Sequence, residues 1–284
     1  MDARPVLVTG ARGFVGARAM EMIPNAVACP SALLREGNAE HIAAYVQELA
    51  PATIIHTAAI SDIGDCERDP EGSRRANVEL TVAMARAARA AGAKLVAFSS
   101  DQVYTGCGED GPYSEQLRLP EPANVYARHK LEAEARSLDI WPESVLLRAE
   151  WMYDMPLYGH KNRGNFLVNT LRAVQTGGKI ACSEHVHRGI TYVRQVVELL
   201  PQAAGLPGGV YNYGSENELT MPQTARALLE ALRLGELADR LIEIRPERQH
   251  SLWLDCSALR RHGIAFDTTA EGFARCARDY GLSG

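Results

Sequence analysis

The chain contains no run of about 18 consecutive apolar residues, the length that a membrane-spanning helix requires. Its first strand-like segment already begins at Pro5, which leaves no room for a signal peptide before it. These absences predict a cytoplasmic protein with no membrane partner. The formal net charge of −5 also argues against a nucleic-acid partner.

Metal-binding and disulfide motifs are absent as well. The six cysteines are scattered along the sequence, and none of them forms a Cys-x-x-Cys pair. His185 and His187 stand close together, but no cysteine or carboxylate framework accompanies them. We therefore expect reduced, structural thiols and no bound metal.

Strand and helix signals alternate regularly through the first half of the chain. Strand-like segments occur at residues 5–9, 26–29, 52–57, 93–99 and 144–148. Helical segments occur at residues 13–23, 38–50, 70–91 and 124–138. This alternation predicts an α/β fold with a parallel sheet flanked by helices. Beyond residue 150 the pattern is irregular, with helices expected at 165–176, 191–204, 221–233 and 270–280.

A glycine motif follows the first strand directly and leads into a helical segment. Gly10, Gly13 and Gly16 have the spacing Gly-x-x-Gly-x-x-Gly. The first glycine permits a tight turn, the second lets backbone approach a pyrophosphate, and the third lets the helix pack closely on the strand. The motif predicts a dinucleotide site in which the helix N-terminus receives the phosphates. A glycine-rich turn without a ligand is the alternative.

Tyr126 and Lys130 form a Tyr-x-x-x-Lys pair within an expected helix. Residues four apart share one helix face, so an ammonium should lie beside the phenol. A neighbouring cation favours phenolate, and we therefore expect a lowered pKa for Tyr126. Ser100, at the end of the fourth expected strand, is the third candidate. The three side chains would form a proton-transfer site.

These motifs together resemble the extended short-chain dehydrogenase/reductases, and most closely their dTDP-4-dehydrorhamnose reductase branch. Residues 99–106 (Ser-Ser-Asp-Gln-Val-Tyr-Thr-Gly) resemble the branch's Ser-Thr-Asp-x-Val-Phe-x-Gly. Residues 112–115 resemble its Pro-Tyr/Trp-x-Glu, residues 148–153 its Arg-x-x-Trp-x-Tyr, and residues 165–166 its Asn-Phe. The resemblance covers nearly the whole chain and is strongest between residues 5 and 170.

The resemblance implies a Rossmann fold, that is, a doubly wound parallel sheet with helices on both faces. Residues 1–150 would form the NAD(P)-binding domain. Residues 151–284 would form mainly a smaller substrate-binding lobe, with some segments returning to the sheet. The implied reaction is hydride transfer to a sugar ketone, in which Tyr126 donates the proton, Lys130 also binds the nicotinamide ribose and Ser100 orients the carbonyl oxygen.

The expected cofactor is NADP(H) rather than NAD(H). The window 28–32 lacks the Asp or Glu that holds the ribose 2′-hydroxyl in NAD-specific units. Arg12 and Arg35 could instead bind a 2′-phosphate, although Arg12 could also be a solvated turn residue. With the three motif glycines, Tyr126 and Lys130, the expected cofactor contacts are Arg12, Phe14, Val15, Arg35, Thr57, Ala58, Ala59, Asn77 and Ser99.

Gln102 distinguishes this chain from the related 4,6-dehydratases, which carry Asp-Glu where this chain has Asp101-Gln102. A Gln side chain cannot exchange a proton as Glu does, so the pair argues against elimination chemistry. This leaves a reductase or an epimerase, and the resemblance implies a nucleotide-linked 4-keto sugar as the substrate. Its expected contacts are Asp101, Gln102, Val103, Trp151, Asn165 and Arg188.

Arg188 also marks a departure from the rhamnose branch, which often lacks an arginine at this place. Several other extended members use it to bind the nucleotide diphosphate. This departure argues against dTDP-rhamnose as the end product. Two alternatives to a reductase also stay open. One is an NAD-dependent nucleotide-sugar epimerase, and the other is a non-catalytic regulatory subunit resembling the methionine adenosyltransferase beta subunit. A homodimer is an expectation from the superfamily.

Overall fold

The computed structural model describes residues 4–108, 111–157, 164–246 and 250–282. The chain divides into two compact units. The first unit comprises Met1–Cys107, Arg118–Ala149 and Val197–Asn212. The second comprises Gly108–Leu117, Glu150–Val196 and Tyr213–Gly284. Val197–Asn212 therefore returns to the first unit after the chain has entered the second.

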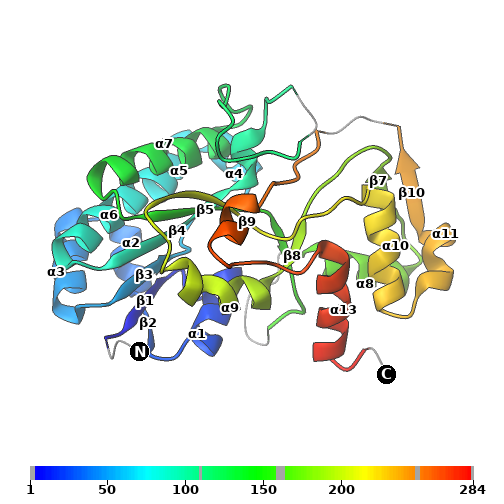
Figure 1. Cartoon of the computed structure of the whole chain (residues 1–284), viewed down its shortest axis with the longest axis horizontal. Helices are drawn as coiled ribbons and strands as arrows, with labels where there is room; N and C mark the ends of the chain where they lie inside the picture. The colour runs from blue at the N-terminus through cyan, green and yellow to red at the C-terminus, as the bar shows by residue number, and fades with distance from the viewer. Residues whose placement is uncertain (1–3, 109–110, 158–163, 247–249, 283–284) are drawn as a thin grey trace. The chain divides into compact units, whose positions relative to one another are not determined.

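A six-stranded sheet forms the centre of the first unit, in the order β2-β1-β3-β4-β5-β9 (Figure 1). The strands are β1 (Val6–Thr9), β2 (Ala26–Ala28), β3 (Thr53–His56), β4 (Lys94–Ser100), β5 (Val145–Ala149) and β9 (Gly209–Tyr213). Strand β1 pairs in parallel with both β2 and β3, and β4 pairs in parallel with β3 and β5. The predicted α/β fold with a parallel Rossmann-type sheet is confirmed.

Strand β2 lies on one side of β1 in the sheet, and β3, β4 and β5 follow in order on its other side. Right-handed crossovers then place the intervening helices on opposite faces of the sheet. Helices α3, α6 and α7 lie side by side, whereas α1 contacts β1 and β2 (Figure 1). The helices of this part are α1 (Phe14–Met22), α2 (Ser31–Glu36), α3 (Ala39–Leu49), α4 (Ile63–Arg68), α5 (Pro70–Arg74), α6 (Leu80–Ala91) and α7 (Val125–Ile140).

Apolar side chains from four strands form the core of this unit. Leu7, Ile54, Leu95 and Leu146 are at most 2% exposed, and Met84 of α6 packs into the same cluster. Because both faces of a parallel sheet are covered, its strands are short apolar runs. This explains why the five strands expected in the first half of the chain are all present.

The helix expected at residues 70–91 is not continuous. A five-residue π-helical segment, Arg75–Glu79, separates α5 from α6. Asn77 in this segment is fully buried, and its side chain is bonded to the loop after β3. Such a segment is set by tertiary contacts, so helical periodicity alone could not predict it.

The second unit contains two small parallel sheets and several helices. Strand β6 (Trp151–Tyr153) pairs with β8 (Ile190–Tyr192), and β7 (Ile180–Ser183) pairs with β10 (Ile242–Arg245). None of these strands was expected from the sequence. The helices are α8 (Phe166–Thr176), α10 (Met221–Ala231), α11 (Ala238–Leu241), α12 (Ser257–Arg261) and α13 (Thr269–Asp279). Helix α9 (Val193–Ala203) begins in this unit and ends in the first.

Stacked rings fill the core of the second unit. The Tyr153 ring lies 5.7 Å from that of Tyr192 and 5.0 Å from that of Phe273, measured between centroids. All three side chains are at most 1% exposed. Offset and edge-on aromatic pairs of this kind add to the stabilisation from buried area.

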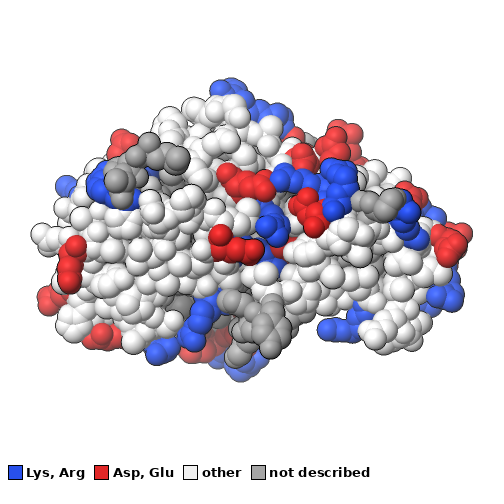
Figure 2. Space-filling view, turned by 90° about the horizontal axis from the view of Figure 1, so that it is seen from below, with Lys and Arg blue, Asp and Glu red and all other residues white. Residues whose placement is uncertain are grey.

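Charged side chains lie scattered over the surface. On the face shown in Figure 2, basic and acidic side chains of the described residues lie interspersed. Among the described residues, every helix is too short or too polar to cross a bilayer.

His56 is buried at the end of β3 and bonded at both ring nitrogens. Its Nδ1 lies 2.8 Å from the Thr9 hydroxyl, and its Nε2 lies 3.1 Å from the Thr81 hydroxyl. Because the Thr81 hydroxyl donates its proton to the Asn77 carbonyl, it can only accept from His56. The ring is therefore the neutral Nε2–H tautomer. Burial lowers the pKa of His56 to about 3, and the charge on Lys130 adds to this shift.

We expect His56 to make the fold sensitive to acid. The pKa of His56 is lower in the folded than in the unfolded chain. Below about pH 6.5 the unfolded chain therefore binds a proton that the folded chain does not bind, which favours unfolding. Stability should fall by about 2 kcal/mol between pH 8 and pH 5 from this residue. Urea unfolding at the two pH values should show a smaller fall in His56→Gln. Exposed His41, changed to Gln, provides the control; equal falls in the wild type and His56→Gln would contradict the prediction.

Candidate functional site

The glycine turn lies between the ends of β1 and β3. Gly10 has a positive φ of 67°. A 2.7 Å hydrogen bond from the Gly13 N–H to the Gly10 carbonyl closes the turn of residues 10–13. A Cβ at Gly10 would lie 2.7 Å from the Thr57 hydroxyl oxygen and 2.8 Å from the Ala58 nitrogen. Only glycine satisfies both the backbone angle and the close approach.

Gly16 lets α1 pack against this turn. A Cβ there would collide with the Gly10 carbonyl oxygen. Gly13 is the N-cap of α1, and no side chain caps the helix at this end. The free N–H groups and the lack of side chains leave a cradle that fits a pyrophosphate.

Thr9 joins the ends of β1 and β3, although the sequence analysis did not single it out. Its hydroxyl accepts hydrogen bonds from the N–H groups of Thr57 and Ala58, at 3.1 and 3.2 Å. The Thr57 hydroxyl donates in return to the Thr9 carbonyl, at 2.7 Å. These bonds bring Thr57 and Ala58 to the glycine turn, at the point where strand order reverses and α/β sheets bind ligands. Ala59 is exposed just beyond them.

Arg12 extends from the glycine turn toward the end of β2. Its Nη2 donates to the Ser31 hydroxyl at 3.3 Å, and its side chain is exposed. Arg35 lies in the last turn of α2 and is also exposed. Both guanidinium groups thus lie on the segments that follow β1 and β2, where a Rossmann unit binds the adenosine ribose of its cofactor.

Phe14 opens α1 and is 38% exposed, while Val15 is half-buried. The guanidinium of Arg18 lies 4.4 Å above the Phe14 ring and donates to the Phe14 carbonyl. Arg18 is buried and was not expected from the sequence. It stiffens the first turn of α1 at the cradle.

Asn77 supports the loop after β3. Its amide accepts from the Ile60 N–H at 3.0 Å and donates to the Ile60 carbonyl at 2.9 Å. A further bond of 3.1 Å goes to Ser73, whose hydroxyl lies 2.9 Å from Nδ1 of His129 on α7. The side-chain polar atoms of Asn77 thus have protein partners, and its contact with the cofactor stays a prediction.

The three catalytic candidates converge from β4 and α7. Ser100 ends β4, and Tyr126 and Lys130 lie on the first turns of α7, whose N-cap is Asn124. All three side chains are less than 9% exposed. The Lys130 ammonium lies 5.7 Å from the centroid of the Tyr126 ring and donates to the Phe98 carbonyl at 2.7 Å. The spacing argument therefore placed these groups correctly beside one another.

The expected lowering of the Tyr126 pKa is wrong for this structure. Burial raises the pKa of Tyr126 well above its usual range, and its hydrogen bond with Ser100 lowers it only in part. The charge on Lys130 does not offset this rise in the Tyr126 pKa. Burial also lowers the pKa of Lys130 to about 8, against the opposing attraction of Glu134. Tyr126 is therefore a neutral phenol near pH 7, which is the form that donates a proton.

The segment after β4 turns back on Ser100. The Ser100 hydroxyl donates to Asp101 at 3.1 Å and accepts from the Gln102 N–H at 3.2 Å. The Gln102 amide donates to the same Asp101 oxygen at 3.4 Å and accepts from Asn124 at 3.4 Å. Val103 is fully buried beneath them. Asp101 and Gln102 thus lie beside the Ser100 hydroxyl, and Val103 is part of the core.

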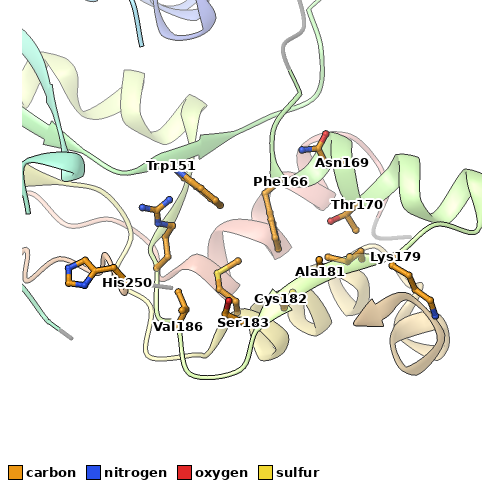
Figure 3. Close-up of a pocket in the computed structure, with 13 residues that line it drawn as sticks. Trp151, Phe166, Asn169, Thr170, Lys179, Ala181, Cys182, Ser183, Val186 and His250 are labelled. Atoms are coloured by element: carbon orange, nitrogen blue, oxygen red, sulfur yellow. The ribbon is translucent and has the colours of Figure 1, made fainter. Parts of the chain in front are cut away.

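A pocket of about 300 Å³ lies within the second unit (Figure 3). Two expected substrate contacts line it: Trp151, whose side chain is 47% exposed, and Arg188, which is 8% exposed. The Arg188 guanidinium lies 4.0 Å from the centroid of the Trp151 ring, a cation–π contact. In Figure 3, Phe166 stands between Trp151 and Thr170, with Cys182 and Val186 below them.

Asn165 caps α8 and does not line this pocket. Its side chain accepts from the Val168 N–H and donates to the Asp154 carbonyl at 2.8 Å. The sequence analysis named none of the other lining residues as substrate contacts. Four of them lie on β7, a strand that it did not predict, and three lie on α8. The other lining residues are Phe166, Asn169, Thr170, Lys179, Ile180, Ala181, Cys182, Ser183, Val186, Met221 and His250.

The fold and the first-unit site define an extended short-chain dehydrogenase/reductase, a class of NAD(P)-dependent oxidoreductases. Residues 4–253 match the RmlD substrate binding domain family, and the chain belongs to that family. The resemblance to the dTDP-4-dehydrorhamnose reductase branch is thereby confirmed.

Individual relatives agree with this membership. The chain is 29% identical to methionine adenosyltransferase 2 subunit beta of Bos taurus, over 92% of this chain and 83% of that protein. It is 29% identical to the dTDP-4-dehydrorhamnose reductase of Salmonella typhimurium, over 71% of this chain and 56% of that protein. The dTDP-4-dehydrorhamnose reductase of Bacillus anthracis str. Ames, solved in complex with NADP, has the same fold. Its TM-score is 0.83 at 22% identity, covering 97% of this chain and 99% of that one.

Gly16→Ala should damage the cradle. The added methyl group cannot fit against the Gly10 carbonyl, so α1 must move away from β1. Overpacking of this kind costs about 1–3 kcal/mol of folding stability. Thermal unfolding should show the loss, and dinucleotide binding should weaken. Gly108→Ala is the control, because nothing lies within 4 Å of its Cβ position; equal effects of the two changes would contradict the prediction.

Proposed function

We propose that the chain is an NADP(H)-dependent reductase of a nucleotide-linked 4-keto sugar. The observation that carries this proposal is the convergence of Ser100, Tyr126 and Lys130 in the same unit as the glycine cradle. Membership of the RmlD substrate binding domain family supports it.

When bound, the nicotinamide cofactor would supply hydride to the carbonyl carbon. Tyr126, neutral near pH 7, would donate the proton that the carbonyl oxygen requires. Ser100 influences the pKa of the nearby Tyr126 and would orient the same oxygen as negative charge develops on it. The Lys130 ammonium, held by the Phe98 carbonyl, would stabilise the resulting phenolate.

Gln102 supports reduction over elimination. Its amide is held between Asp101 and Asn124, in the position where a dehydratase would carry a glutamate. An amide in this network can orient Asp101 but cannot remove a proton from a sugar carbon.

Trp151 and Arg188 are the proposed nucleotide contacts. The exposed Trp151 ring offers an apolar face to a base or sugar. The Arg188 guanidinium, packed on that ring, is a suitable donor to a diphosphate.

The preference for NADP(H) rests on Arg12 and Arg35. Changing Arg12 to Ala should weaken NADPH binding about 10- to 100-fold, the effect of one hydrogen bond to a charged group. NADH binding should change little, because NADH lacks the 2′-phosphate. Fluorescence titration with both cofactors measures this. Exposed Arg86 on α6, changed to Ala, provides the control; tighter binding of NADH than of NADPH by the wild type would contradict the preference.

A regulatory subunit is the second candidate. The similarity to methionine adenosyltransferase 2 subunit beta, over 92% of this chain, favours it. A subunit that only binds could lose the catalytic side chains, whereas Ser100, Tyr126 and Lys130 are all present here.

Tyr126→Phe should separate these functions. Loss of the phenol proton should lower turnover of a 4-keto sugar by about 10²- to 10⁴-fold, the range that general acid catalysis supplies. NADPH binding should persist, because the ring remains. Turnover is followed by NADPH absorbance over a panel of nucleotide 4-keto sugars, with Tyr45→Phe on α3 as the control. Near-normal turnover by Tyr126→Phe would exclude the mechanism. A wild type without turnover on the whole panel would favour the regulatory subunit.

A further inference from the structure

A buried ion pair connects α7 to β5 in the first unit. Glu134 accepts from Arg148 through both oxygens: Nε lies 3.0 Å from Oε1, and Nη2 lies 2.7 Å from Oε2. Both side chains are only 5% exposed. The remaining Arg148 nitrogen, Nη1, donates to the Tyr104 hydroxyl at 2.9 Å, and that hydroxyl donates to Asn212 at 2.7 Å.

The same carboxylate is bonded to β4. The Ser99 hydroxyl donates to Oε1 of Glu134 at 2.5 Å. Ser99 immediately precedes Ser100, and Glu134 lies one helical turn after Lys130, on the same face of α7. Glu134 is therefore bonded to the residue before Ser100 and lies one helical turn from Lys130, without being a catalytic candidate itself.

We propose that Glu134 is a positioning residue for the reaction, which holds the Lys130 face of α7 against the Ser100 end of β4. The inference rests on the proposed function of this site. A lysine on a helix and a serine at a strand end have no covalent reason to keep a fixed separation. The Lys130 ammonium is itself bonded to the Phe98 carbonyl of β4, and the Glu134 carboxylate adds a second bond between the two elements, to Ser99. Arg148 fixes this carboxylate from a third element.

Stability alone is a poor explanation for this pair. Removing two charges from water costs about as much as their attraction returns, so apolar residues of similar volume would stabilise the core as well or better. The geometric effect of the pair, in contrast, requires this carboxylate in this place. It would fix both the distance and the direction between α7 and β4.

Glu134 also acts on Lys130 through its charge. Burial lowers the pKa of Lys130 to about 8, and Glu134 is the largest opposing influence. Other titratable or charged groups lie on the elements around Lys130. Those that reach it include Cys66 on α4, His56 on β3 and Tyr126 on α7.

Glu134→Gln tests the proposal with nearly unchanged side-chain volume. We expect kcat to fall about 10- to 100-fold, as small misplacements of catalytic groups produce, with KM for the sugar near the wild-type value. Loss of the negative charge should lower the Lys130 pKa, so the alkaline fall of kcat should move to lower pH. Glu132→Gln is the matched control, because Glu132 lies on the same helix, is half-exposed and pairs with Arg74 and Arg136.

A second readout does not depend on turnover. The chain contains only four lysines, so NMR of lysine labelled with carbon-13 should resolve each titration. The Lys130 signal, assigned with Lys130→Arg, should titrate at lower pH in Glu134→Gln and unchanged in Glu132→Gln. A wild type without turnover would count against the proposed function but not against the role of Glu134. The titration would then show whether Glu134 acts on Lys130. Lys130 titration and kcat in Glu134→Gln that match Glu132→Gln would overturn the inference.

Ser99→Ala covers the case in which Glu134→Gln does not fold. It removes only the bond from β4 and leaves the ion pair intact. We expect a folded protein whose kcat is lowered about 3- to 10-fold, the effect of one hydrogen bond. Wild-type kcat in folded Ser99→Ala would contradict the role of the carboxylate in holding β4.

Discussion

The close approach of backbone segments at the ends of β1 and β3 is the constraint on which the first unit depends. Gly10 and Gly16 have no room for a Cβ, and Thr9 bonds the two strand ends together. The same contacts that close the turn leave the N-terminus of α1 uncapped. The close packing of α1 and the open anion site thus have the same cause. Only a helix that packs this closely on the turn brings its N–H groups to the end of β1.

The sequence predicted this unit well because its signals are local. Buried parallel strands appear as short apolar runs, and the turn between β1 and α1 requires glycine at fixed positions. Beyond residue 150 the four expected helices are present as α8, α9, α10 and α13, but the strands of the second unit were missed, for the opposite reason. Strands such as β6 and β8 have three residues each, and they exist because they pair with a segment far away in the sequence. A three-residue strand has too few positions to show an alternating pattern.

Sequence spacing located the catalytic candidates but could not give their electrostatics. A separation of four residues places Lys130 beside Tyr126, yet the pKa of the phenol depends on how deeply both are buried, and burial comes from the surrounding elements. Asn77 and Asn165 show the same limit. Their amides are bonded to the carbonyls of Ile60 and Asp154, which lie in loops whose positions the sequence does not reveal.

Burial of Lys130 bears on the choice between an enzyme and a regulatory subunit. A lysine whose pKa falls from 10.5 to about 8 costs about 3 kcal/mol of folding stability at neutral pH, where its charged form must be desolvated. Methionine at this position would fill similar space without that cost. A protein that only binds a dinucleotide could place a lysine at the surface of the site and avoid the cost. An ammonium buried beneath the ring of Tyr126 is useful where a negative charge develops on that ring, as it does when the phenol gives up its proton. The position of Lys130 therefore suits the proposed proton transfer from Tyr126, alongside its expected role in binding the nicotinamide ribose.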